Sequence, residues 1–445
     1  MPGRRGSIRI AAWTSVGIIG ALVALTICAA LVPRTLPRLD APLHQIAAGA
    51  IFVASYLALA IGRVPGLSID RAGIALVGGA LMLASGAISL PDAYKAIDLG
   101  TLSLLLGMML VVANLRLSGV FAIATRWVAG HARRPVLLLG AVILVSGIAS
   151  AFLVNDAICL VLAPLVVDLA QALRRRPMPY LLAVAMASNI GSTATITGNP
   201  QNMLIGTSSG ISYADFAASL GPIAAVGLIV LLGLAVLLHW WEFRDGAMPA
   251  PARQLVHAHP VLAARSLIAT VAVIILFFIG VPPAEAAILI GALLLLTRRL
   301  RSARIYAEID WSLLLMFAGL FVIVAAAEQQ LLTGDIIAQA GRLHLDRTFP
   351  LTGITAVLSN LVSNVPAVLV LKPFVAALSD PRKAWKVIAM ASTLAGNFTL
   401  LGSVANLIVA EKSAQRGVTI TFWDYFRLGA PVTVLTLLIG AFWLG

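Results

Sequence analysis

Long apolar stretches recur from one end of this 445-residue chain to the other, and they restrict its fold more than any other feature. The first stretch runs from Ile10 to Val32, which exceeds the roughly 20 apolar residues that a helix needs to cross a bilayer. Inside a bilayer every backbone polar group must be paired within the protein, so such stretches form helices. Only 11% of the residues are charged, against about 25% in a soluble domain. The chain cannot cover a water-facing surface, and we predict an all-α polytopic membrane protein.

The basic residues before Ile10 indicate an uncleaved first span with a cytoplasmic N-terminus. A cleaved secretory signal, whose apolar region is roughly 7–15 residues long, is the alternative. Two further apolar regions, 135–173 and 349–379, are interrupted by polar residues, a pattern typical of re-entrant hairpins that enter the membrane and turn back. The fold prediction is therefore about 11 transmembrane helices plus two hairpins. The predicted spans are 10–32, 44–62, 71–90, 99–116, 180–206, 216–240, 261–280, 284–297, 310–327, 387–410 and 428–444.

Basic residues lie mostly in the short loops between these spans and give the chain a net charge of +13. If the spans alternate and each hairpin returns to its own side, the cytoplasmic side holds about 22 Lys and Arg residues and the other side about 9. This bias follows the positive-inside rule and predicts a multi-pass protein of the cytoplasmic (inner) membrane. A nucleic-acid partner is not expected, because proteins that bind nucleic acids cluster their basic residues on a water-facing surface. Segments 117–130 and 328–345 are mixed in character and are expected along the membrane interface.

An internal repeat relates the two halves of the chain. Three sequence blocks recur in the same order: "AIDLGTLSLLLGMML" with "EIDWSLLLMFAGLFV", "VNDAICLVLAP" with "SNVPAVLVLKP", and "AMASNIGSTATITGNPQN" with "AMASTLAGNFTLLGSVAN". Such order and spacing are unlike chance similarity, and they indicate duplicated halves. The matched pairs include Asp98 and Asp310, Gly107 and Gly319, Asn155 and Asn364, Pro164 and Pro373, Ser188 and Ser392, Thr195 and Thr399, Gly198 and Gly402, and Asn202 and Asn406.

Each predicted repeat has five spans and one hairpin, an odd number of crossings, so the second copy is expected to be inverted relative to the first. Inverted repeats with broken helices are the architecture of secondary transporters, which bind their substrate near the midplane between the repeats. The predicted organisation is an extra span (1–33), repeat 1 (34–240, with hairpin 135–173 and broken helix 180–206), a cytoplasmic linker (241–260), and repeat 2 (261–445, with hairpin 349–379 and broken helix 387–410).

The polar stretch "ASNIGSTATITGNPQNMLIG", residues 187–206, lies inside one of these spans. We predict that Gly198 and Pro200 interrupt its helical hydrogen bonds there. Free backbone groups and Asn, Thr and Ser side chains would then face a ligand, with helix N-termini favouring an anion and carbonyl oxygens a cation. The alternative is that these small residues only let helices pack closely, which we favour for single positions such as Ser188 and Thr193.

These residues resemble the ion transporter superfamily, which contains arsenite permeases, sodium–proton antiporters of the NhaD type, and divalent anion–sodium symporters with their citrate-transporter relatives. "SNIGSTATITGNPQNMLIG" is the most specific match, and "FLVNDAICLVLAP" is similar to the arsenite-permease hairpin. The resemblance covers nearly the whole chain after the first span. It implies a scaffold with a moving transport unit, an elevator-type motion and a homodimer.

The resemblance also implies a set of binding residues. In the dicarboxylate branch each hairpin tip carries Ser-Asn-Thr, whereas here the tips are Val154-Asn155-Asp156 and Ser363-Asn364-Val365, which argues against a two-sodium dicarboxylate site. Na⁺ near Asn155, Asp156 and Asn364 is one candidate coupling ion. The implied hairpin contacts are Asn155, Ser363 and Asn364, and the implied broken-helix contacts are Thr197, Gly198, Asn199, Asn202, Gly402, Ser403 and Asn406.

Ionisable residues within apolar segments indicate how transport is coupled. Asp156 is the main candidate, since an acid at membrane depth is costly and usually functional; it would bind Na⁺ or carry H⁺, or it is only held by a helix N-terminus. Lys372 either extends its amine to the membrane surface or acts as a built-in cation. Asp98 and Asp310 are expected to cap helices, and Asp168 to be solvated.

No catalytic or cofactor motif stands out in the sequence. The string "GTSSG", centred on Ser208, matches the serine-hydrolase motif but follows an apolar helix rather than a strand, so a membrane-embedded hydrolase is only a remote alternative. No metal-binding spacing of His or Cys occurs, and Cys28 and Cys159 are expected to pack within the membrane. We therefore predict a non-enzymatic, ion-gradient-coupled permease for small inorganic or carboxylate anions or arsenite. A sodium–proton antiporter is the alternative.

Overall fold

Helices form the whole framework of the described protein. The computed structural model describes residues 20–31, 40–61, 67–131, 134–244, 259–297, 299–332 and 342–445, and these ranges contain no strand. This is the all-α membrane fold that the sequence predicts. Besides the helix Gly20–Leu31, the elements are α2 (Asp40–Ile61), α3 (Arg71–Ala84), α4 (Leu90–Ala96), α5 (Leu99–Ser118), α6 (Val120–His131), α7 (Pro135–Phe152), α8 (Asn155–Ala172), α9 (Pro177–Ser192), the 3₁₀ turn η2 (Ile196–Gly198), α10 (Pro200–Ser209), α11 (Tyr213–Leu238), α12 (Trp240–Phe243), α13 (Pro260–Phe278), α14 (Pro283–Leu295), α15 (Ser302–Tyr306), α16 (Trp311–Leu331), α18 (Thr348–Val362), α19 (Asn364–Val375), α20 (Pro381–Ala395), α21 (Val404–Ala414) and α22 (Phe422–Leu444).

Among the described helices, eight are long and apolar enough to cross a bilayer, and five apolar helices are shorter. The predicted spans 180–206 and 387–410 are each divided into two shorter helices. The predicted span 71–90 ends early because Ser85 caps α3 and the following Gly86 has a φ of 75°, which closes the helix. Helices α7 and α8, which form the first predicted hairpin, are both among the eight helices that are long and apolar enough to cross a bilayer. The number of crossings therefore stays a prediction.

The contacts divide the chain into two compact units. Unit 1 comprises residues 1–102, 310–345 and 361–378, and unit 2 comprises residues 103–309, 346–360 and 379–445. Each unit combines segments from both halves of the sequence, so neither coincides with a predicted repeat. The repeats and their inverted orientation remain sequence-based predictions.

In unit 1, α3 and α16 pack backbone against backbone. A Cβ atom on Gly319 of α16 would lie 2.5 Å from the carbonyl carbon of Ala75 on α3, and one on Gly79 would lie 3.3 Å from the Gly319 oxygen. Glycine at these positions lets the two helices approach without side chains between them, as is common in membranes. The same unit ties α2 to α19, since Tyr56 donates from its hydroxyl to the Pro366 carbonyl at 3.4 Å.

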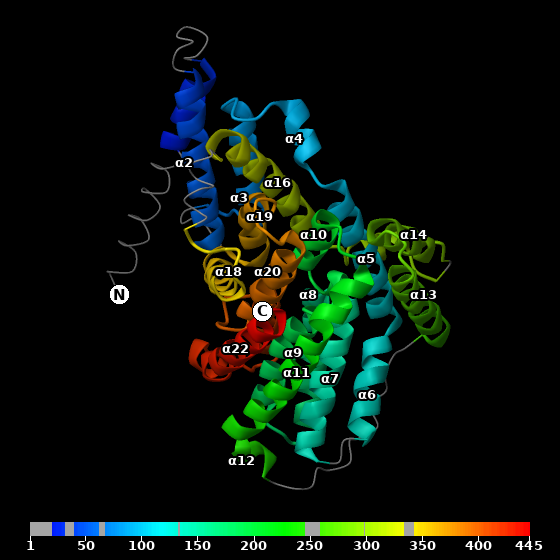
Figure 1. The fold of residues 1–445 in the computed structure, drawn as a ribbon. Helices are drawn as coiled ribbons and strands as arrows, with labels where there is room; N and C mark the ends of the chain where they lie inside the picture. Colours follow the sequence, from blue (N-terminus) through cyan, green and yellow to red (C-terminus); the bar gives the residue numbers. More distant parts are fainter. Residues whose placement is uncertain are drawn as a thin grey trace, which may run out of the picture. The chain divides into compact units, whose positions relative to one another are not determined.

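In unit 2, α7, α9 and α11 run side by side (Figure 1). A Cβ atom on Gly191 of α9 would lie 2.5 Å from the Cα atom of Gly147 on α7, so only glycine fits there. Every residue of α9 from Pro179 to Ser192 is buried. This explains the near-absence of polar–apolar alternation in α9, because a helix surrounded by other helices needs no polar face.

The two predicted hairpins differ in structure. Helices α7 and α8 pack on each other and are joined at Leu153 and Val154, and each has 18 residues, about 27 Å at 1.5 Å per residue. By length both could cross the bilayer, so the re-entrant character of this hairpin stays a prediction. The arms of the second hairpin, α18 and α19, join at Ser363; α18 belongs to unit 2 as far as Asn360, and α19 belongs to unit 1. Ser363 has a φ of 76°, a conformation that costs a non-glycine residue energy.

The acidic residues near helix ends mostly behave as predicted. Asp98 accepts the backbone N–H of Thr101 at 3.0 Å, and Asp310 accepts that of Leu313 at 3.0 Å, which confirms both caps. Asp168, predicted to be solvated, is partly exposed and also pairs with Arg416 at 2.9 Å, because the ends of α8 and α21 lie together.

Among the described residues of unit 2, four ion pairs each join segments that the predicted topology assigns to the same side of the membrane. Three lie on its predicted cytoplasmic side and one on the other side. They are Arg116 with Glu308, Arg175 with Glu242 at 4.0 Å, and Arg416 with Asp168, and on the opposite side Lys386 with Asp215 at 3.0 Å.

Candidate functional site

The first helix break separates α9 from α10. Helix α9 ends at Ser192, the turn η2 follows, and α10 begins at Pro200. A Cβ atom on Gly198 would overlap the carbonyl oxygen of Ser192, so the turn requires glycine. Pro200 does not interrupt a helix as predicted; it is the first residue of α10, where its missing N–H costs nothing. The break therefore begins before Gly198, and Asn199 caps the new helix by accepting the Asn202 N–H at 2.9 Å.

The second break separates α20 from α21 in unit 2 and uses the same hydrogen-bond pattern. Asn202 donates its side-chain amide to the carbonyls of Ser192 and Thr195, at 3.1 and 3.0 Å. Asn406 donates to the carbonyls of Gly396 and Thr399, at 2.8 and 3.1 Å. Each asparagine thus satisfies carbonyl groups that the interrupted helix leaves open, as the obligatory pairing of buried backbone groups requires.

Asn189, in the last turns of α9, joins the two breaks to the first hairpin tip. Its Oδ1 accepts from the Asn155 amide at 3.1 Å and from the Ser403 hydroxyl at 3.2 Å. Its Nδ2 donates to Asn397 Oδ1 at 2.9 Å and to Asn406 Oδ1 at 3.0 Å. All five side chains are buried. We call this group the Asn189 cluster; every member lies in unit 2.

The amide orientations in the Asn189 cluster follow from its backbone contacts. The Nδ2 group of Asn406 faces two carbonyl oxygens, so its Oδ1 must face Asn189 and needs a donor. Asn397 is fixed in the same way, because its Nδ2 donates to the Met186 carbonyl at 3.3 Å. Asn189 must therefore present Nδ2 to both, which leaves its Oδ1 for Asn155 and Ser403.

A second set of contacts links the two broken helices directly. Asn199 donates to the hydroxyls of Ser192 at 2.9 Å and Thr393 at 3.2 Å. Gln201 also donates to Thr393, at 3.1 Å. The two breaks, which lie about 200 positions apart in sequence, are thus held together by neutral side chains.

Three helix N-termini begin at these residues: α8 at Asn155, α10 at Pro200 and α21 at Val404. Each contributes the partial positive charge of a helix N-terminus. At α10, Pro200 has no N–H and the Asn202 N–H is already bonded to Asn199. Within the described residues, Asn155 Oδ1 and Asn202 Oδ1 are buried and lack a hydrogen-bond partner. The site therefore offers the positive ends of three helices to an oxygen-rich solute, and two carbonyl oxygens that can accept from its hydroxyl groups or hold a cation.

Asp156 lies beside this site in the first turn of α8 and is half-buried. A carboxylate there is stabilised by the helix N-terminus, so both predicted roles, coupling and simple capping, are compatible with its position. The adjacent Cys159 thiol lies 3.1 Å from the Ser188 hydroxyl, which also reaches the Asn155 carbonyl at 3.4 Å. These contacts fix the start of α8 on α9.

Two other predicted contacts have structural partners. The Thr197 hydroxyl lies 2.7 Å from the Tyr213 hydroxyl. A Cβ atom on Gly402 would lie 2.8 Å from the Gly396 oxygen, so this glycine shapes the second break.

Ser363, Asn364 and Lys372 belong to unit 1, and their approach to the Asn189 cluster stays a prediction. Ser208 of the hydrolase-like string lies within helix α10, not on a strand-to-helix turn.

Five buried residues of this site were not predicted. The repeat comparison selected positions that are identical in both halves, whereas Asn189 is matched by Thr393, and Thr193 by Asn397. An asparagine within a buried helix of small residues was itself a usable signal, since buried amides need partners. The residues that the prediction missed are Asn189, Ser192, Gln201, Thr393 and Asn397.

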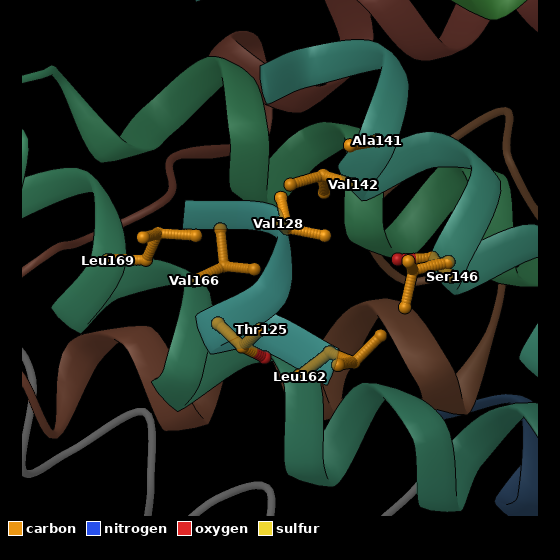
Figure 2. A pocket seen from close by; sticks show the side chains of 9 residues that line it. Thr125, Val128, Ala141, Val142, Ser146, Leu162, Val166 and Leu169 are labelled. Carbon is orange, nitrogen blue, oxygen red and sulfur yellow. The ribbon is translucent and has the colours of Figure 1, made fainter. Parts of the chain in front are cut away.

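A separate small cavity lies between α6, α7 and α8 of unit 2 (Figure 2). It measures about 20 Å³, and its walls are mostly valine and leucine side chains. Ser146 is a polar group at its edge, and its hydroxyl lacks a partner within the described residues. The cavity holds at most about one water molecule, so it is a packing gap rather than a substrate site.

Comparisons with known proteins agree with this architecture. Residues 56–395 match the family described as citrate transporter. A silicon efflux transporter of Oryza sativa subsp. japonica is 29% identical over 473 residues, which cover 90% of this chain and 98% of that protein. An uncharacterized transporter of Mycobacterium tuberculosis is 29% identical with the same coverages, and a transporter of Dictyostelium discoideum named arsB is 26% identical, covering 84% of this chain and 87% of its own length.

Among solved structures, the YdaH transporter of Alcanivorax borkumensis has a similar fold. The TM-score is 0.57 with 15% sequence identity, and the match covers 89% of this chain and 97% of that one. At this identity the likeness concerns the fold alone.

Proposed function

The chain belongs to the citrate transporter family and is a membrane transporter, and we propose that it is a secondary active permease for small oxyacids, either anions or arsenite. The family match covers more than half of the chain. The proposal adds the substrate class and the coupling to an ion gradient. It assigns the lipid bilayer of the cytoplasmic membrane as the location.

The observation that carries the proposal is the Asn189 cluster. Asn189 connects a hairpin tip with two helix breaks, and three helix N-termini begin around it. A simple packing role for small polar residues would not require interrupted helices, because each interruption opens backbone carbonyl groups that Asn202 and Asn406 must pair. Interrupted helices around a central polar site are a property of secondary transporters.

The chemistry of the site favours a small solute with several oxygen atoms. The site is neutral, because amides and hydroxyls that bond to one another and to backbone carbonyls surround three helix N-termini, and this suits a weakly charged or neutral oxyacid. The unpartnered acceptors Asn155 Oδ1 and Asn202 Oδ1 suit a solute that also carries O–H groups. Two relatives have names that fit this class, a silicon efflux transporter and a transporter called arsB. Small carboxylates remain within the proposal through the family match.

The coupling ion is H⁺ or Na⁺, and Asp156 is the residue that we propose carries or binds it. Its position in the first turn of α8 puts a carboxylate one residue from Asn155 of the cluster. Lys372 is the second coupling candidate. An elevator-type motion and a homodimer complete the proposal, and both rest on the family resemblance.

The test is transport by purified protein in proteoliposomes. Concentration jumps of citrate, succinate, phosphate, silicic acid and arsenite, with arsenate as comparison, are applied at two pH values with and without Na⁺. Currents and an internal pH dye report charged solutes and protons, and direct uptake reports neutral ones. We expect uptake of an oxyacid that Asn155→Ala abolishes. Asn114→Ala is the matched control, because Asn114 is equally buried but bonds only to its own helix, at Leu110.

A sodium–proton antiporter is the second candidate, and the position of Asp156 is the observation that favours it. In that case Na⁺ alone would move protons, and Asp156→Asn would abolish the movement. A Na⁺-driven pH change in the absence of every anion and oxyacid would replace the permease proposal. Uptake of no tested solute by folded protein would refute both.

A further inference from the structure

A pocket at one end of unit 2 lies away from the Asn189 cluster. Three helix ends meet there: the start of α9, the end of α11 with α12, and the start of α22. The pocket has a volume of about 360 Å³. From Pro177 to Asn189, α9 rises by about 18 Å at 1.5 Å per residue, so the pocket is distinct from the candidate transport site. Its lining residues are Arg176, Met178, Pro179, Leu238, His239, Trp241, Asp424 and Arg427.

The charge of this pocket is positive. Within the described residues, no carboxylate lies within ion-pair distance of the Arg176 or Arg427 guanidinium group, and both side chains are exposed. Glu242 is close enough to interact electrostatically with Arg176, but Arg175 is its ion-pair partner. Asp424, the one acid in the lining, caps α22: its carboxylate accepts from the N–H and hydroxyl of Thr421, at 3.1 and 2.6 Å. Two arginines are therefore available for an anion. Arginine binds phosphate oxygens with paired N–H donors, which makes phosphate the best-fitting partner.

Aromatic residues indicate that this end lies at the membrane surface. Trp240, Trp241 and Trp423 are 53%, 50% and 63% exposed, and all three flank the pocket-forming helix ends. Tryptophan is enriched where a membrane protein passes from the hydrocarbon core to the headgroups. Leu238 and Met178 add apolar wall beside the two arginines. A ligand that has a phosphate group and an apolar body would contact both kinds of surface.

We propose that this pocket binds the phosphate group of an anionic phospholipid, with Arg176 and Arg427 as its two cationic contacts. Basic pockets between membrane helices near the surface bind lipid headgroups in this way. Trp241 and Leu238 would contact the glycerol region and the first part of an acyl chain. The site is independent of the transported solute, because it lies at the opposite end of α9 from the helix breaks.

The experiment compares lipids on delipidated, detergent-solubilised protein. Binding of phosphatidylglycerol, phosphatidylcholine and inorganic phosphate is measured by native mass spectrometry and by the shift in Tm. The proteins are the wild type, the double variant Arg176→Gln/Arg427→Gln, and Arg244→Gln. Arg244 is the matched control, because it is exposed at the same end but lies over the Trp240 ring, at 5.7 Å, and does not line the pocket.

We expect the wild type and Arg244→Gln to retain phosphatidylglycerol selectively. Each basic residue near a surface contributes roughly 1 kcal/mol to anionic-lipid binding, so the double variant should bind it about thirtyfold more weakly. Equal retention of phosphatidylcholine and phosphatidylglycerol by the wild type would overturn the proposal without any variant. So would unchanged binding by a folded double variant. Inorganic phosphate that gives the full Tm shift by itself would assign the pocket to a free anion instead of a lipid.

Discussion

Replacing Asn189 by leucine tests whether the Asn189 cluster holds the two helix breaks together. Leucine has a similar size but cannot form hydrogen bonds, so the variant loses four of them: two accepted and two donated. Asn397 Oδ1 keeps one contact, with the Tyr425 hydroxyl at 3.5 Å. The Asn155 amide, the Ser403 hydroxyl and the Asn406 carbonyl would each lose their partner in the cluster.

Two estimates of the cost agree. Side-chain hydrogen bonds in membrane proteins average about 0.6 kcal/mol, so four contribute roughly 2.4 kcal/mol. Three buried groups left without a partner cost at least about 1 kcal/mol each, or roughly 3 kcal/mol. We therefore expect Asn189→Leu to lower the free energy of unfolding by about 3 kcal/mol and to abolish transport.

The assay is reversible unfolding of the full-length protein in mixed micelles, followed by an environment-sensitive probe in unit 2, beside solute uptake in proteoliposomes. Asn114→Leu is the matched control. Asn114 is also fully buried, but its amide makes one bond within α5, to the Leu110 carbonyl at 2.9 Å, and its Oδ1 has no partner within the described residues. That variant should lose roughly 0.6 kcal/mol or less. If both variants lose the same small amount, the Asn189 cluster does not hold the breaks together.

Three further outcomes are expected. Gly198→Ala should abolish uptake and lower Tm, because its Cβ would overlap the Ser192 carbonyl, and normal uptake would contradict the geometry of the break. Ser363→Gly should raise Tm by relieving the positive φ, a gain of about 1 kcal/mol, and an unchanged or lower Tm in a thermal scan would argue against strain at this tip. Burial raises the pKa of Glu242 above its ordinary 4.5, although Arg175 opposes the shift. As the pH rises past 4.5 the unfolded state loses this proton first, so wild-type stability falls until the raised pKa is passed. Glu242→Gln should therefore gain in Tm relative to wild type as the pH rises from 4.5 through the raised pKa, and a difference independent of pH would refute this.

The apolar runs and caps were predictable because they depend on short-range physics. Asp98 and Asp310 directly precede apolar segments, and a carboxylate there has open backbone N–H groups within reach. Helix ends inside an apolar run were less predictable. The polar residues of 187–206 predicted a break, but at Gly198 and Pro200, whereas α9 already ends at Ser192. It ends there because Asn199 and Asn202, further along the chain, replace its missing hydrogen bonds.

The site was predicted in part, through the positions that both halves share. Asn202 and Asn406 have the same role in their respective breaks, so identity between the halves found them. Asn189 and Thr393 differ in chemistry although they are matched in sequence, and each bonds to the opposite half. A comparison that searches for identical residues misses such a pair. The two matched positions lie between the breaks and bond to different partners, so they need different side chains.

The contact between Gly147 and Gly191 has a mechanical consequence. No side chain lies between the two backbones, so α7 and α9 are in direct contact and cannot adjust their spacing by a change of side-chain rotamer. A swing of α7 away from α9 would open a gap that no rotamer change can fill. Thr195 strengthens the junction, since its hydroxyl donates to the Ala151 carbonyl near the end of α7. A conformational change that moves a solute past the Gly147–Gly191 contact must therefore move α7 and α9 together as one rigid body.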